Sequence, residues 1–168
     1  MSIRSANVSD SALLIKLFQS LDQESSFMLL DPSERDLSLD NQEKQMLGFV
    51  DSNSQVMFVK EAENSELSGF IVGVAGNFMR NKHSLYCVIG VKEDYHSRGI
   101  GKALLTKLEI WAKEHNIHRI ELTVMEHNTK AIKLYESFGF VHEGIKRDSI
   151  RIAGKFINEL YMSKLLTI

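Results

Sequence analysis

The stretch whose residue types and spacing most clearly suggest ligand binding is 92–103. It is a polar turn with two glycines that leads into a helix with an apolar stripe. The first turn of a helix has N–H groups without partners and a partial positive charge, so it attracts anions. Gly99 and Gly101 lack a Cβ, which lets a ligand approach the main chain, and Arg98 and Lys102 add positive charge. This spacing predicts a site for a phosphate-bearing ligand.

Two common phosphate-binding loops do not fit this stretch. A Walker loop needs Gly-x-x-x-x-Gly-Lys-Ser/Thr, but His96 occupies its first glycine position and Ala103 its hydroxyl position. The dinucleotide fingerprint Gly-x-Gly-x-x-Gly fails at Leu104, where the third glycine belongs. A nucleotide-binding P-loop protein is therefore disfavoured. For an isolated Gly-x-Gly, a simple turn before a core helix would be the favoured interpretation.

A second motif follows the strand expected at 119–124. Its residues are Asn128, Ala131, Tyr135, Gly139 and Phe140. Together with His96-Ser97-Arg98-Gly99-Ile100-Gly101, this motif closely resembles the GNAT superfamily of N-acetyltransferases. That family combines Gln/Arg-x-x-Gly-x-Gly/Ala with a strand, an Asn and an Ala-x-x-x-Tyr-x-x-x-Gly-Phe helix. The resemblance covers roughly residues 66 to 166 and departs from the pattern at His96, where the family has Gln or Arg.

The resemblance implies an enzyme that uses acetyl-CoA as co-substrate and acetylates a primary amine by direct attack on the thioester. The pantetheine arm would lie between the strand ending at Val91 and the strand 119–124, against main-chain groups, like an added strand. The diphosphate would rest on N–H groups of the glycine turn. The cofactor-binding residues implied are Ile89, Val91, His96, Ser97, Arg98, Gly99, Ile100, Gly101, Lys102, Ala103 and Asn128. Asn128 also fits a helix cap, and the two roles are compatible.

Tyr135 stands where the family has its usual general acid, which returns a proton to the departing CoA thiolate. With reference pKa values of about 10 for a phenol and 8.5 for a thiol, this transfer is uphill by only ~2 kcal/mol. The other interpretation is a tyrosine that only packs. The general base stays open, with Glu121, Glu24, His83 and Tyr86 as candidates.

Several alternatives remain beside this interpretation. His96 either faces the phosphates, so that cofactor binding tightens below about pH 6.5, or is an exposed turn histidine. His115 and His118 are spaced like metal ligands but straddle a helix end, so we expect a surface pair and no metal site. The alternative function is a module that senses acetyl-CoA without turnover. Intact Tyr135 and Asn128 favour the enzyme.

The segment 22–43 is acidic and lies around the acceptor mouth in the resembled fold. Its charged residues are Asp22, Glu24, Asp31, Glu34, Asp36, Asp40 and Glu43, against Arg35 alone. We hypothesise an acidic rim that attracts a cationic amine such as a polyamine, an amino sugar or a protein N-terminus. Solvated helix faces are the alternative explanation.

Composition limits the remaining classes. The 168 residues predict one domain, 1–168, and 43% hydrophobic with 25% charged residues is typical of a soluble globular protein. A net charge of −2 gives no general attraction to nucleic acid, and no apolar run is long enough to span a membrane. Cys87 is the only cysteine, so no internal disulfide forms and the cytoplasm is the expected location. The resemblance also admits a homodimer.

Hydrophobic periodicity predicts the elements that position these residues. A short strand at 3–4 precedes a helix capped by Asp10, and a second helix runs over 40–50 with Met46, Leu47 and Val50 inward. Strands are expected at 56–60, 67–78, 83–91, 119–124, 141–151 and 155–165, with helices after the glycine turn and around Tyr135. The order β-α-α-β-β-β-α-β-α-β-β predicts an α/β (α+β) fold. Its GNAT-like sheet would be mixed, mostly antiparallel, flanked by helices and splayed between the fourth and fifth strands.

Overall fold

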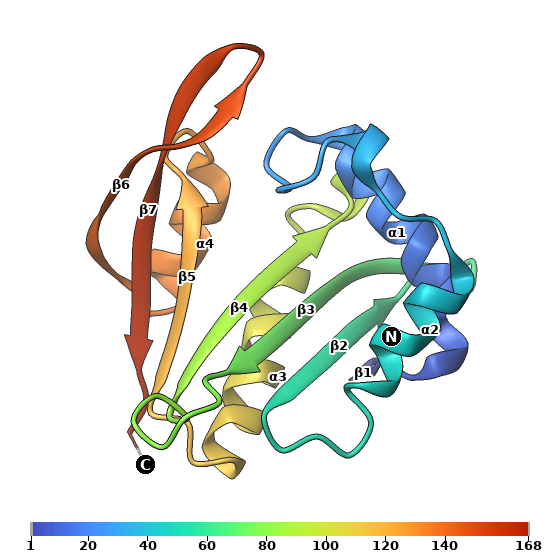
Figure 1. Ribbon diagram of the computed structural model, residues 1–168, viewed down its shortest axis with the longest axis horizontal. Helices are drawn as coiled ribbons and strands as arrows, with labels where there is room; N and C mark the ends of the chain where they lie inside the picture. Colours follow the sequence, from blue (N-terminus) through green and yellow to red (C-terminus); the bar gives the residue numbers. More distant parts are fainter. Residues whose placement is uncertain (1, 168) are drawn as a thin grey trace.

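The computed structural model describes residues 2–167 and shows a seven-stranded open sheet with helices on both faces (Figure 1). The strands are β1 (Ile3–Ser5), β2 (Gln55–Glu61), β3 (Leu67–Ala75), β4 (Ser84–Val91), β5 (Arg119–Met125), β6 (Val141–Ile152) and β7 (Lys155–Leu165). The α-helices are α1 (Ser11–Glu24), α2 (Leu39–Leu47), α3 (Ile100–Glu114) and α4 (Thr129–Ser137). Three single-turn 3-10 helices are η1 (Val8–Asp10), η2 (Pro32–Glu34) and η3 (Glu93–Tyr95). The predicted order of strands and α-helices is confirmed.

The sheet has one discontinuity, which lies between β4 and β5. The strand order is β1-β2-β3-β4-β5-β7-β6, and every neighbouring pair is antiparallel except the parallel pair β4–β5. The β4–β5 pairing runs only from Ser84 opposite Arg119 to Tyr86 opposite Glu121, although β4 continues to Val91. The two strands then diverge and leave a gap in the sheet (Figure 1). This confirms the predicted splay.

Two hydrophobic clusters hold the layers together, one on each face of the sheet. The helices α3 and α4 cover one face, and α1 and α2 cover the other (Figure 1). The α3 cluster includes Leu104, Leu105 and Leu108 against Ile71, Leu85 and Ile120, and the α1 cluster includes Leu14, Leu17 and Met46 against Val59 and Phe70. Alternate residues of β2 enter opposite clusters, with Val56 and Phe58 on the α3 side and Met57 and Val59 on the α1 side, as the period of a strand requires. Within the described residues, no helix has the length and apolar character to cross a membrane.

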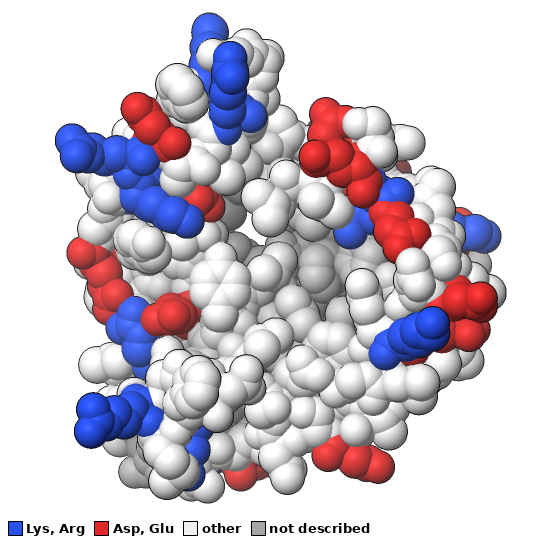
Figure 2. Space-filling view, viewed as in Figure 1, with Lys and Arg blue, Asp and Glu red and all other residues white. Residues whose placement is uncertain are grey.

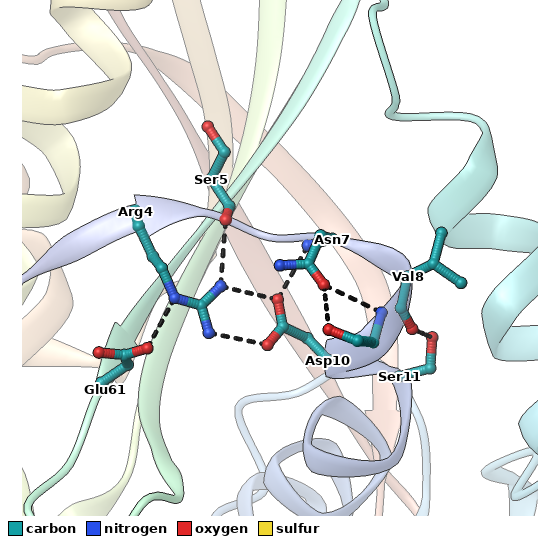
Figure 3. A network of polar contacts seen from close by, with 8 residues as sticks. Arg4, Ser5, Asn7, Val8, Asp10, Ser11 and Glu61 are labelled. Atoms are coloured by element: carbon teal, nitrogen blue, oxygen red, sulfur yellow. Dashed lines mark hydrogen bonds and ion pairs between the residues drawn. The ribbon is translucent and has the colours of Figure 1, made fainter.

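Asp10 has a different role from the predicted cap of the first helix. Its carboxylate accepts hydrogen bonds from both terminal nitrogens of Arg4 at 2.8 Å and from the main-chain N–H of Asn7 (Figure 3). Arg4 also donates to Glu61 on β2, at 2.6 Å. The bidentate guanidinium and the η1 turn use the carboxylate, so α1 begins without a side-chain cap. The network instead ties β1 to β2 and to the start of α1.

Two further expectations about element ends are wrong. The second helix ends at Leu47, and Leu47 and Val50 are 60% and 51% exposed rather than inward. Because Met46 already faces the sheet, the next residue is turned about 100° away from it. The third strand stops at Ala75 and does not reach Phe78, because the carbonyl of Phe78 accepts hydrogen bonds from the N–H groups of Asn81 and Lys82 in the turn that leads to β4.

Candidate active site

The main chain of β4 has an unpaired edge inside the sheet. The N–H of Gly76 bonds to the carbonyl of Ser84, and that of Lys92 bonds to β3, so even-numbered residues of β4 face β3. In an antiparallel ladder the alternate residues turn their N–H and C=O groups the other way. Ile89 and Val91 therefore present these groups to the gap, beyond the last residue that pairs with β5. Such an edge can take an extended ligand by strand addition.

The start of α3 provides main-chain donors without acceptors. The first intrahelical bond runs from the N–H of Ala103 to the carbonyl of Gly99, at 3.0 Å. Gly99 is the N-cap residue and has no side chain to accept a bond, so the N–H groups of Ile100, Gly101 and Lys102 have no intrahelical partner. These donors and the positive end of the helix dipole make this terminus suited to a diphosphate.

The two glycines of this turn serve different purposes. Gly99 has a φ of +74°, and a Cβ placed on it would meet nothing within 4 Å, so the main chain there is open to a ligand. Ser97 also has a positive φ, of 59°, which bends the turn toward the helix start. A Cβ on Gly101 would lie 2.8 Å from Cδ2 of Leu134, so this glycine lets α4 pack closely on α3. Only Gly99 fits the role that the sequence suggests for both.

The residue that departs from the family pattern, His96, turns back toward the end of β4. Its Nε2 lies 2.7 Å from the carbonyl oxygen of Val91, and its main-chain N–H bonds to Glu93. The guanidinium of Arg98 lies over the ring of Tyr95, 5.0 Å from its centroid. The imidazole therefore contacts the strand end at the mouth of the gap.

Asn128 caps α4, which confirms that part of its predicted role. Its side-chain oxygen accepts a hydrogen bond from the N–H of Ala131 at 3.3 Å. The cap occupies only the oxygen, so the amide nitrogen keeps its donors for another group. The compatibility of cap and ligand contact therefore holds in this geometry.

Tyr135 lies in the buried cluster on the α3 side and is 7% exposed. Its ring packs against Phe140, with the centroids 5.7 Å apart. Burial raises the pKa of Tyr135 far above its usual value, and Cys87 and Tyr86 of β4 add to the increase. Both neighbours lie where β4 stops pairing with β5, so the phenol from α4 belongs to the surroundings of the gap and stays protonated.

The pKa of Cys87 shows that burial in this cluster disfavours a thiolate. Burial, with a smaller effect of Glu121, raises the pKa of its thiol to about 12. A thiolate is therefore strongly disfavoured here, and Cys87 is a packing residue rather than a nucleophile.

Three candidates for the general base already have partners. The Glu24 carboxylate accepts the main-chain N–H at the start of η3, at 2.8 Å. Glu121 accepts a hydrogen bond from Arg119 at 2.6 Å. The hydroxyls of Tyr86, the last paired residue of β4, and Thr123, two residues past the last paired residue of β5, lie 2.8 Å apart and join the two strands. In this geometry none of the three is a free base beside the gap.

One contact across the gap was missed by the sequence reasoning. The rings of Phe27, after α1, and His127, after β5, lie 4.9 Å apart. This contact joins the two halves of the molecule, and no local pattern signals it because one hundred residues separate the partners.

His115 and His118, which are spaced like metal ligands in the sequence, bond to two different main-chain carbonyls, those of Trp111 and Leu166.

The electrostatic surroundings of the gap are uneven. Figure 2 shows a hollow between the two halves, with acidic side chains on the α1–α2 side and basic side chains on the β6–β7 hairpin. The exposed carboxylates of the acidic segment are Glu24, Asp31, Glu34, Asp36 and Asp40. Asp22 does not belong to this rim, because it is buried and held by Arg35 at 2.6 and 2.8 Å.

Comparisons of the sequence and of the structure with known proteins indicate the same family. The sequence model of the acetyltransferase (GNAT) family matches residues 15–140. Spermidine N(1)-acetyltransferase of Vibrio cholerae is 26% identical over 132 residues, which cover 78% of this chain and 73% of that protein. The crystal structure of a GNAT acetyltransferase from Streptococcus pneumoniae is 29% identical, with a TM-score of 0.93 over 98% of this chain and 99% of that one.

A structure from Salmonella typhimurium that contains acetyl-CoA as its cofactor shares the fold. It is 20% identical, with a TM-score of 0.87 over 100% of this chain and 95% of that one. The family match covers well over half of the chain, and the gap and the uncapped start of α3 suit an extended ligand that carries a diphosphate. The chain therefore belongs to the acetyltransferase (GNAT) family and carries out acetyl-CoA-dependent N-acetylation of an amine.

Proposed function

We propose that this enzyme holds the pantetheine arm of acetyl-CoA in the gap between β4 and β5 and acetylates a small cationic amine. The amine enters from the α1–α2 side of the hollow. The observation that carries the proposal is the part of β4 beyond Tyr86 that has no β5 partner, where the main chain of Ile89 and the N–H of Val91 face the gap and the strand leads on to the uncapped start of α3. The cofactor-binding residues are those of the glycine turn, the two strand residues and Asn128.

The reaction follows from the groups around the gap. The neutral amine attacks the thioester carbonyl, and a main-chain N–H of Ile89 or Val91 stabilises the oxyanion that forms. The C–N bond forms, the C–S bond breaks, and the amine nitrogen loses its proton to water. Tyr135 donates its proton to the departing CoA thiolate as general acid. Glu24, Glu121 and Tyr86 already have partners, so a water chain is the proposed route by which the amine is deprotonated, and His83 is the remaining candidate base.

The raised pKa of Tyr135 does not make it an unsuitable acid. A phenol with a higher pKa is a weaker acid, but the surroundings that raise it also raise the pKa of a nearby thiol. Cys87 reaches about 12 for this reason. We propose that burial also disfavours a CoA thiolate formed beside Tyr135, which favours its protonation by the phenol.

The acidic rim supports a cationic acceptor. Acidic side chains gather on the α1–α2 side of the hollow (Figure 2), and opposite charge raises the local concentration of a cation. The relative from Vibrio cholerae acts on spermidine, which is a polyamine. The proposal therefore ranks polyamines and amino sugars above acceptors without a second positive charge.

The test is release of free thiol from acetyl-CoA with a panel of amines that contains a polyamine, an amino sugar, an amino acid and a peptide with a free N-terminus. We expect turnover with at least one cationic member, and a KM for it that rises with ionic strength. Binding of acetyl-CoA without turnover on any amine would favour the sensor module instead. A KM that is insensitive to salt would remove the acidic rim from the proposal.

We also propose a cellular location and an oligomeric state for the enzyme. A cytoplasmic location fits the single buried thiol of Cys87, which has no disulfide partner. A homodimer is supported by large hydrophobic side chains that are exposed on the two strands at the sheet edge, namely Val141, Ile145, Phe156, Tyr161 and Leu165.

A further inference from the structure

The last peptide unit of β4 is held from both sides. The N–H of Lys92 donates to the carbonyl of Ser68 on β3, at 2.9 Å. The carbonyl of Val91 belongs to the same planar peptide unit and points the opposite way, into the gap. There it meets Nε2 of His96 at 2.7 Å. The orientation of this peptide plane therefore depends on one strand neighbour and one side chain.

The His96 contact replaces a strand partner that is missing at this point. Between Ser84 and Tyr86, β5 supports the gap side of β4, but the pairing ends there and Val91 lies five residues further on. A strand end with bonds on one side only can rotate its peptide planes. A ligand that adds as a strand needs these planes in fixed orientation, because it binds through the same N–H and C=O groups.

The hydrogen bond also determines which form of the imidazole is present. Nε2 must carry a proton to donate to the Val91 carbonyl, which leaves Nδ1 as an acceptor in the neutral ring. A lone acceptor is unsuited to binding a phosphate oxygen. The carbonyl of Val91 has a second lone pair, so an amide N–H of the cofactor can share it with His96.

We infer that His96 is a positioning residue that orients the Val91–Lys92 peptide for the pantetheine arm, and that it acts through the Val91 carbonyl rather than on the phosphates. The inference rests on the proposed function, since it assigns a role toward bound acetyl-CoA. It also explains how a histidine serves at a position where the family has Gln or Arg. All three side chains carry an N–H donor that can bond to a carbonyl.

The experiment compares His96→Gln, which keeps a neutral N–H donor, with His96→Leu, which keeps bulk and removes the donor. The side chain is exposed, so neither change disturbs the core, and a thermal melt of each variant confirms folding. We expect His96→Leu to raise the KM of acetyl-CoA roughly three- to tenfold, the effect of one hydrogen bond, with kcat nearly unchanged. His96→Gln restores the wild-type KM.

A spectroscopic measurement tests the contact itself. Side-chain ¹⁵N NMR of the wild type above neutral pH should show His96 as the Nε2–H tautomer. An Nδ1–H tautomer would overturn the inference. So would a KM for His96→Leu equal to that of the wild type, or a defect in His96→Gln as large as that in His96→Leu. These results leave the proposed function intact, whereas a folded wild type that does not bind acetyl-CoA would overturn both.

Discussion

The sharpest test of the mechanism is Tyr135→Phe, which removes one oxygen atom from a buried ring. Within residues 2–167 the Tyr135 hydroxyl makes no hydrogen bond to another protein group, and the ring contact with Phe140 survives the change. We therefore expect the melting temperature to stay within about 2 °C of the wild type, because no partner is left unsatisfied. The affinity for acetyl-CoA should also be nearly unchanged.

The magnitude of the catalytic loss follows from the role of a general acid, since proton transfer by a positioned side chain contributes typically about 10²–10⁴-fold. Burial raises the pKa of the Cys87 thiol in the same hydrophobic cluster, so a CoA thiolate that leaves without a proton beside Tyr135 is expected to be disfavoured as well. Water can supply part of the missing proton donation, so we expect kcat to fall by at least about 100-fold.

The assay is thiol release at saturating acetyl-CoA and amine, beside calorimetric titration of acetyl-CoA. Tyr95→Phe is the matched control, because it removes a phenol oxygen from η3 and keeps the ring beneath Arg98. Turnover of Tyr135→Phe within twofold of the wild type would exclude Tyr135 as the general acid. A large loss of acetyl-CoA affinity would show instead that the phenol serves binding.

Three other predictions concern stability and assembly. Hydrogen bonds from Arg119 and Ser163 lower the pKa of Glu143 from 4.5 to about 2, so its contribution is full above about pH 4.5 and is lost as the pH falls toward 2. Melting temperatures of Glu143→Gln and the wild type should differ at neutral pH and converge near pH 2, and a constant difference would contradict this. A Cβ on Gly90 would lie 2.7 Å from Phe70, so Gly90→Ala should cost about 1–3 kcal/mol and lower the melting temperature by about 2–12 °C, whereas Gly144→Ala, with open space around it, should not. Phe156, 62% exposed at the sheet edge, should support the dimer, so Phe156→Asp should shift the mass measured by light scattering toward the monomer, and a wild type that is monomeric at high concentration would refute the dimer.

Much of the fold was accessible from the sequence because its signals are local. Alternating and helical periodicities placed every strand and α-helix, and errors occurred at ends, as with Leu47 and Val50. The end of a helix depends on which of its residues pack against the rest of the fold. In α2 the buried residue near the end is Met46, and the chain leaves the helix one residue later. Asp10 failed as a predicted cap for a similar reason. The guanidinium of Arg4, six residues earlier, binds the Asp10 carboxylate. Glu61 on β2 also bonds to Arg4 and helps to hold it in this position.

Some features of the candidate site could likewise be predicted from local sequence, and others could not. The uncapped helix start at Gly99 and the cap at Asn128 could be predicted, because both are properties of consecutive residues. The packing role of Gly101 could not, since it depends on Leu134 from another helix. Nor could the engagement of Glu121 or the Phe27–His127 contact, since each needs the folded geometry.

The order of residues alone therefore determined the family motifs, the succession of elements and the positions where main-chain donors lack partners. These follow from backbone geometry over a few neighbouring positions. Only the tertiary structure decided where β4 leaves β5, which carbonyl His96 meets and which carboxylates are already paired. Such contacts join residues that the chain separates, and their energies depend on distance and burial, which a sequence does not contain.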